Sequence, residues 1–287
     1  MANNQPQDLF FVNCNLCQSS KNKLLSKKNS YQIVRCANCG LVYINPRASV
    51  SYICNLYKEN KSSPFDYYYN LTKIDKERFK KLFSEINKYR KSGRVLDFGC
   101  ATGSFLQVAK EYGYQVHGVE VNPSAAAYAR NVLGLDILEG TVNKFSYKED
   151  FFDIVHMGDV IEHLPDPLST LKLVNIFMKK EGLLILTTPN FNSILTKIFQ
   201  IKPEEYLYYF NKDTLHKMIE LAGFKVLFIK GIDKIKSIEA LKFSSTFSSN
   251  NIFRLLFNAL DGMQLNKMNI KFPFQEDLLA FAVKKIG

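Results

Sequence analysis

The fold is decided by residues 95–106, which read VLDFGCATGSFL. An apolar run ends at Asp97, a turn containing Gly99 and Gly103 follows, and a helix is expected to begin near Ser104. A strand that passes through a glycine turn into a helix is typical of a parallel sheet covered by helices. Glycines are needed where backbone approaches a ligand that leaves no space for a Cβ atom. The stretch therefore predicts an α/β domain with a ligand at this turn.

The spacing of the glycines differs from that of a dinucleotide site. They follow G-x3-G and an aspartate precedes them, whereas a dinucleotide fingerprint reads G-x-G-x-x-G. S-adenosylmethionine has no phosphate, and its α-amino group and sulfonium are cationic, which favours a carboxylate such as Asp97. A second strand is predicted over residues 115–119, and Glu120 at its end can accept both ribose hydroxyls. The pattern favours S-adenosylmethionine as the cofactor.

Four motifs in order resemble those of the class I methyltransferases. Residues 95–106 and 118–123 (GVEVNP) are similar to motifs I and II, residues 153–167 (DIVHMGDVIEHLPDP) to the fourth strand and its loop, and residues 183–190 (LLILTTPN) to the fifth strand and its exit. The chain resembles the group carrying EHLPDP and TPN, which includes ubiquinone-type O-methyltransferases and enzymes of glycan and natural-product pathways. The resemblance covers about residues 94–230 and implies a Rossmann-like sheet, parallel except for an antiparallel last strand.

The resemblance also implies a set of cofactor residues. The chain departs from the family at Ala101, where glycine is usual, and a methyl group is tolerable there if φ is negative. The implied pocket consists of Asp97, Gly99, Ala101, Gly103 and Glu120, with Val121 beside the adenine and Met157 and Gly158 near the sulfonium.

The acceptor side is expected beyond the fourth strand. His163 is the candidate general base, because an unperturbed pKa of about 6.5 suits proton removal near neutrality. Asp159, Glu162 and His163 match a pattern that ubiquinone-type enzymes associate with a divalent cation such as Mg²⁺, and His163 bracing the loop is a third reading. Tyr206, which stands where relatives often carry histidine, is expected to form an aromatic substrate wall with Tyr208 and Tyr209.

Four of the six cysteines form two knuckles near the N-terminus. Cys14 and Cys17 form one C-x2-C pair and Cys36 and Cys39 the other, with 18 residues between the pairs. This spacing is typical of a structural zinc site, in which four sulfurs leave no open position for catalysis. Residues 31–35 and 41–44 read as strands around the second knuckle. A module that recurs ahead of this methyltransferase group ends, like this one, in Asn45-Pro46-Arg47.

The chain divides into three predicted parts. They are a zinc-ribbon-like module (residues 1–50), a helical segment (51–93) and a methyltransferase domain (94–287) with an insertion (231–274). Helices are expected over Asp75–Lys91 and from Asp213, as N-cap, to Leu221, and strands over Phe224–Ile229 and Asp277–Lys284. The apolar run Ile252–Leu260 in the insertion is read as a helix packed on its own domain, with a lid, a dimer contact or a membrane-surface helix as alternatives.

We predict an enzyme that O-methylates a small molecule such as a sugar or glycan intermediate. The net charge of +11 lies outside the mildly acidic central domain and attracts anionic partners, so an RNA methyltransferase that grips phosphates with the zinc module is the alternative. A C- or N-methyltransferase and a non-catalytic binding module also remain open. No secretion signal or membrane-spanning run is apparent, so we expect a cytoplasmic protein. The sequence leaves the oligomeric state undetermined.

Overall fold

The computed structural model describes residues 9–58, 65–144, 146–199, 201–237 and 269–286. Its centre is a seven-stranded sheet in the order β12-β13-β10-β9-β6-β7-β8. The five strands from β10 to β8 are parallel, and β13 is antiparallel to both of its neighbours. The Rossmann-like sheet with an antiparallel last strand is thus confirmed. The strands are β6 (Arg94–Phe98), β7 (Gln115–Glu120), β8 (Asp136–Glu139), β9 (Phe152–Gly158), β10 (Met178–Pro189), β12 (Phe224–Ser237) and β13 (Asn269–Lys284).

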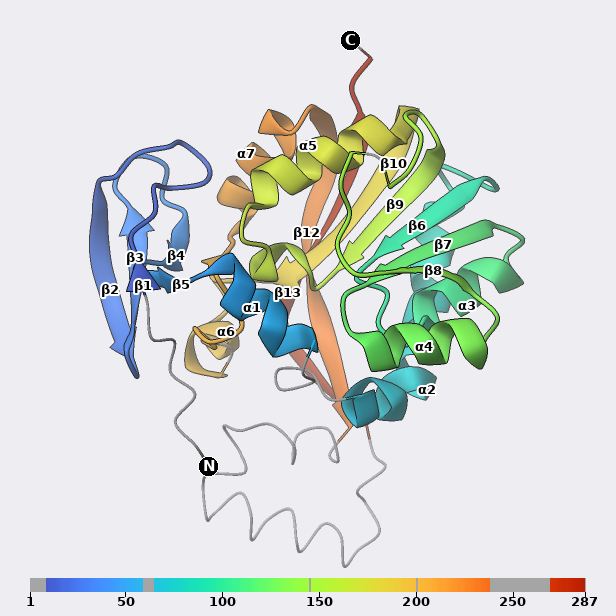
Figure 1. The fold of residues 1–287 in the computed structure, drawn as a ribbon, viewed down its shortest axis with the longest axis horizontal. Helices are drawn as coiled ribbons and strands as arrows, with labels where there is room; N and C mark the ends of the chain where they lie inside the picture. The colour runs from blue at the N-terminus through green and yellow to red at the C-terminus, as the bar shows by residue number, and fades with distance from the viewer. Residues whose placement is uncertain (1–8, 59–64, 145, 200, 238–268, 287) are drawn as a thin grey trace, which may run out of the picture.

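Helices cover both faces of this sheet (Figure 1). One face carries α2 (Phe65–Ile86), α3 (Ser104–Glu111) and α4 (Pro123–Asn131), and the other carries α5 (Pro167–Phe177) and α7 (Lys212–Leu221). The central strands β6, β9 and β10 are mostly buried, which explains the apolar runs of these strands in the sequence. None of the helices among the described residues is long and apolar enough to cross a membrane.

Two helices differ at their ends from the sequence-based expectation. The helix expected from Asp75 to Lys91 begins at Phe65 and ends at Ile86. Asn211, not Asp213, is the N-cap of α7, because its side chain accepts from the backbone N–H of Thr214 while the Thr214 hydroxyl accepts from that of Asn211.

The N-terminal residues 9–48, here called the cysteine ribbon, form a smaller sheet with help from the large domain. The ribbon contains β1 (Leu9–Phe10), β2 (Asn22–Lys28), β3 (Tyr31–Cys36), β4 (Val42–Ile44) and β5 (Arg47–Ala48). Its four-stranded sheet has the order β11-β4-β3-β2, and β11 (Tyr208–Tyr209) comes from the large domain. The boundary near residue 50 therefore separates two sequence segments but not two independent sheets.

The ribbon lies beside the large sheet, and α1 (Val50–Lys58) leads from it (Figure 1). At one edge of the large sheet, β12 and β13 form a long antiparallel pair that reaches Ser237 and Asn269, so both strands extend into the predicted insertion. The apolar run Ile252–Leu260 lies outside the described residues. The short α6 (Ile194–Phe199) follows β10.

Candidate active site

The turn after β6 adopts a backbone conformation that favours glycine. Gly99, Ala101 and Gly103 have φ angles of +82°, +47° and +84°. A Cβ atom on Gly99 would lie 2.6 Å from Val160 Cγ2, and one on Gly103 would lie 2.5 Å from Leu135 Cδ1. The condition that φ is negative at Ala101 is wrong, and its left-handed conformation costs about 1–2 kcal/mol. The turn is nevertheless a close cradle for a ligand.

Glu120, at the end of β7, directs its carboxylate at this turn. Its Oε2 accepts from the Ala101 N–H at 2.8 Å and its Oε1 from the Asn122 N–H at 2.7 Å. Burial raises the pKa of Glu120, and these N–H groups oppose the shift. The two oxygens of a carboxylate offer about four acceptor sites in all, so Glu120 retains acceptor capacity for a ribose hydroxyl beside its backbone N–H partners. The donor set therefore fits the nucleoside end of S-adenosylmethionine.

Asp97 is engaged inside the protein. It pairs in register with His156 on the neighbouring strand β9, and its Oδ1 accepts from His156 Nδ1 at 2.7 Å. Both side chains are buried, and the imidazole stacks on Phe105 with 3.9 Å between the ring centroids. The contact between Asp97 and His156 could not be predicted, since cross-strand register is invisible in one sequence. Any interaction of Asp97 with a cationic ligand is shared with this imidazole.

The three remaining cofactor candidates differ in exposure. Met157 is fully buried in the main core, so its side chain presents no surface to a ligand. Val121 and Gly158 are partly exposed. A Cβ atom on Gly158 would lie 2.7 Å from Cε1 of His156, so glycine leaves space there for the imidazole.

His163 lies in a 3-10 turn, η1 (Ile161–His163), just beyond β9. Its Nδ1 is 2.9 Å from the Glu205 carbonyl oxygen, which can only accept, so Nδ1 carries the proton and Nε2 the lone pair. Burial lowers the pKa of His163 from 6.5 to about 4, against the opposing effects of that carbonyl and of Asp159. The side chain is 20% exposed, and its ring meets Tyr206 edge-on. The imidazole is neutral near neutrality but is a weaker base than the sequence suggested.

The structure does not support the predicted second cation site. Within the described ranges, the four cysteines are the group of His, Cys, Asp or Glu side chains whose ligand atoms converge. Glu162 Oε2 instead accepts from the Thr188 hydroxyl at 2.8 Å, and Asp159 Oδ1 lies 3.3 Å from Thr187 Oγ1. The carboxylates of Glu162 and Asp159 thus contact threonine hydroxyls of β10, and their oxygens do not converge with His163 on a site for Mg²⁺.

The predicted tyrosine wall is reduced to one residue. Tyr206 is partly exposed beside His163, whereas Tyr208 and Tyr209 are buried. Because β11 pairs with β4, Tyr208 stacks near Tyr43 and Tyr209 packs in the core of the ribbon. These two rings hold the ribbon in place and do not line an acceptor site.

The four ribbon cysteines converge. The Sγ atoms of Cys14 and Cys39 are 3.4 Å apart, as are those of Cys17 and Cys36, and all four lie within 4.8 Å of one another. Zn–S bonds of about 2.3 Å in a tetrahedron place sulfurs about 3.8 Å apart, so this spacing fits one zinc ion.

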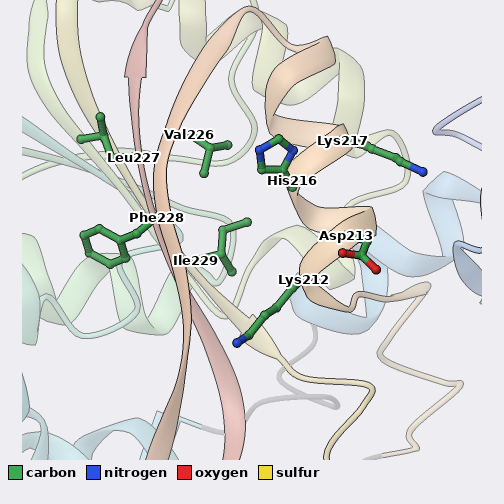
Figure 2. A pocket seen from close by; sticks show the side chains of 8 residues that line it. All are labelled: Lys212, Asp213, His216, Lys217, Val226, Leu227, Phe228 and Ile229. Carbon is green, nitrogen blue, oxygen red and sulfur yellow. The ribbon is translucent and has the colours of Figure 1, made fainter.

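Figure 2 shows a hollow between α7 and the edge strand β12. Its volume is about 520 Å³, and Val226 and Ile229 project into it from the strand. It contains none of the predicted site residues. It is lined by Lys212, Asp213, His216, Lys217, Val226, Leu227, Phe228 and Ile229.

Comparison with known proteins agrees with this geometry. The sequence model of the methyltransferase-domain family matches residues 74–228, more than half of the chain. A ubiquinone biosynthesis O-methyltransferase from Actinobacillus pleuropneumoniae is 28% identical over 107 residues, 34% of this chain and 46% of the relative. One from Bradyrhizobium diazoefficiens is 35% identical over 104 residues, 34% of this chain and 41% of the relative. The chain thus spans less than half the length of these two relatives.

The fold is shared with solved structures. A S-adenosylmethionine-dependent methyltransferase from Thermotoga maritima superposes with a TM-score of 0.53 at 20% identity, covering 81% of this chain and all of that one. The structural superposition shows the fold, and the match to the sequence model over residues 74–228 shows the family. The chain therefore belongs to the class I S-adenosylmethionine-dependent methyltransferase family.

Proposed function

We propose that the protein transfers a methyl group to a hydroxyl of a small molecule, with sugar or glycan intermediates as the acceptor class. The observation that carries the proposal is the pairing of a glycine cradle and Glu120 on one side with neutral His163 and Tyr206 on the other. Two relatives named ubiquinone biosynthesis O-methyltransferase favour oxygen as the acceptor atom.

The cofactor side would be formed by the turn at Gly99–Gly103 and by Glu120. S-adenosylmethionine, when bound, supplies a methyl group already activated on its sulfonium. Glu120 would accept the ribose hydroxyls with the acceptor sites left over from its two backbone N–H partners. Gly99 would keep the turn in this shape, since a Cβ atom there would collide with Val160.

On the acceptor side, His163 would remove the proton of the acceptor hydroxyl. Its Nδ1–H is held by the Glu205 carbonyl, so Nε2 is the atom that would take the proton. Because its pKa is about 4, His163 remains unprotonated throughout the neutral range. As a weak base, it would take the proton of the acceptor hydroxyl only while the bond between the acceptor oxygen and the methyl group forms. Tyr206, which packs against the His163 ring, would contact the acceptor.

We further propose that Cys14, Cys17, Cys36 and Cys39 bind one structural zinc ion. The support is the convergence of the four sulfurs. A segment as small as the cysteine ribbon buries little apolar surface, so a metal contributes directly to its folding.

The acceptor can be tested by incubating the purified protein with S-adenosylmethionine labelled in its methyl group and with separated fractions of metabolites, glycans and total RNA. We expect label in the metabolite or glycan fraction, at oxygen, and greatly reduced transfer by Glu120→Ala. Label confined to RNA would overturn the proposal in favour of the phosphate-binding alternative. Label on carbon or nitrogen would overturn the hydroxyl acceptor, and binding of cofactor with no transfer to any fraction would favour a non-catalytic module.

A further inference from the structure

The cysteine ribbon is connected to the acceptor side by a continuous chain of backbone hydrogen bonds. The Ile44 N–H, in β4, donates to the Leu207 carbonyl at 3.0 Å, and the Leu207 N–H donates to the Glu162 carbonyl at 2.8 Å. One residue, Leu207, therefore links the ribbon to the turn that carries His163. The same segment carries Tyr206, the ring that packs against His163.

Arg47 ties the ribbon to both acceptor-side segments at once. Its Nη1 donates to the Tyr208 hydroxyl at 2.7 Å and its Nη2 to the Pro165 carbonyl at 2.9 Å. The Tyr208 hydroxyl donates to the same carbonyl at 3.1 Å, which closes a triangle. Pro165 lies two residues after His163, and Tyr208 lies two residues after Tyr206. Only the planar fork of a guanidinium can hold both acceptors in this way.

A third connection starts within the first cysteine knuckle. Asn15, between Cys14 and Cys17, donates from Nδ2 to Asp166 Oδ1 at 2.8 Å and accepts at Oδ1 from the Leu168 N–H at 3.0 Å. Asp166 is the N-cap of α5, the helix that follows the His163 loop. A change in the position of the first cysteine knuckle would therefore alter the hydrogen bonds at the end of this loop.

Other ribbon contacts reach the second acceptor-side segment. Lys28 Nζ donates to the Ile201 carbonyl at 2.6 Å, and Asn29 Nδ2 donates to Glu204 at 2.8 Å. The cofactor cradle is built mainly by β6 and β7, with Leu135 packing against Gly103 and with Val160, from the His163 loop, packing against Gly99. The ribbon thus contacts the two segments that form the acceptor side at several points.

We infer that the cysteine ribbon positions the acceptor side of the active site, and that Arg47 is the positioning residue that holds the segments carrying His163 and Tyr206 together. This inference rests on the proposed function for the role of those two residues. The cysteine site then determines the geometry at which the acceptor is held. Loss of its metal would disturb the acceptor side before the cofactor side.

The test compares Arg47→Lys, which keeps the charge but loses the fork, with wild type and with Arg35→Lys, the same change at an exposed position of β3. Hydrogen–deuterium exchange is measured on the full chain. We expect exchange in residues 159–168 and 202–209 to become about tenfold faster or more in Arg47→Lys, since bonds from a charged donor are lost. Peptides covering residues 97–103 and 115–122, and all peptides of Arg35→Lys, should stay within about twofold of wild type.

Two further measurements separate positioning from general destabilisation. The Nδ1 proton of His163, sheltered by its bond to the Glu205 carbonyl, should be visible in the nitrogen-15 spectrum of wild type and lost to solvent exchange in Arg47→Lys, with His163→Gln providing the assignment. Affinity for S-adenosylhomocysteine should be unchanged in calorimetry. Removal of zinc by a chelator should reproduce both results.

The inference is overturned if Arg47→Lys leaves exchange and the His163 signal as in wild type, or if it weakens S-adenosylhomocysteine binding in parallel with them. These measurements do not depend on methyl transfer. If His163→Gln still transfers methyl groups, the proposed base is wrong, while the exchange result for Arg47→Lys still decides whether the ribbon positions the two segments.

Discussion

Replacing Ala101 with glycine should stabilise the protein, although it removes a methyl group. Ala101 has φ +47°, whereas Gly99 and Gly103 on either side have +82° and +84°. A left-handed conformation costs a non-glycine residue about 1–2 kcal/mol, and glycine avoids this cost. Glycine also increases the conformational entropy of the unfolded chain, which destabilises the folded state by about 0.5–1 kcal/mol. We therefore expect the free energy of unfolding to rise by about 0.5–1 kcal/mol.

The measurement is thermal unfolding of Ala101→Gly beside wild type, Gly99→Ala and Gly103→Ala. For a chain of this size the expected gain corresponds to a rise of about 1–4 °C in Tm. Both glycine-to-alanine variants should unfold at lower temperature, because their Cβ atoms would lie 2.6 Å from Val160 Cγ2 and 2.5 Å from Leu135 Cδ1. Calorimetry with S-adenosylhomocysteine should show binding retained in Ala101→Gly. A lower Tm for Ala101→Gly would refute the reasoning, since it would mean that the residue does not adopt the left-handed conformation.

Three further predictions concern the carboxylate, the histidine and the cysteines. Because folding raises the pKa of Glu120 above 4.5, the contribution of Glu120 to stability should grow as pH falls from neutrality toward 4.5. Affinity for S-adenosylhomocysteine should fall over the same range. Glu120→Ala should flatten both trends, measured by unfolding and by calorimetry at a series of pH values. His163→Gln should slow methyl transfer about 10²–10⁴-fold without changing cofactor affinity. Because the pKa of His163 is about 4, the wild-type rate should not change with pH near 6.5 through protonation of this residue. A pH-dependent change in rate centred on 6.5 would contradict the buried neutral imidazole. Metal analysis should find zinc in wild type and none in Cys36→Ser. Cys100→Ser, which changes a buried thiol outside the cluster, should retain the zinc.

Much of the fold could be predicted because its signals are local. The strand through Asp97, the glycine turn and the helix from Ser104 appear where the run of apolar residues, glycines and polar residues indicated them. The two cysteine pairs predicted a shared site, because their spacing is a property of consecutive residues. Glu120 lies at the end of its strand for the same reason.

Other features depended on neighbours that are distant in the chain. The positive φ of Ala101 follows from the path that the turn must take to bring its N–H to Glu120. The pKa of His163 follows from burial beneath a segment more than 40 residues away. Neither influence leaves a trace in the local sequence.

The sequence by itself determined the α/β sheet, the position of the cofactor turn and the pairing of the cysteine knuckles, because each depends on short-range periodicity or spacing. The class I methyltransferase fold followed from the resemblance of four motifs to that family. The tertiary structure alone decided that Asp97 is bound by His156, that Tyr208 belongs to the ribbon sheet, and that Arg47 reaches the loop after His163. Strand register and sheet completion bring together residues as distant in the chain as Val42 and Tyr209, and such contacts arise only when burial of two surfaces fixes their relative placement.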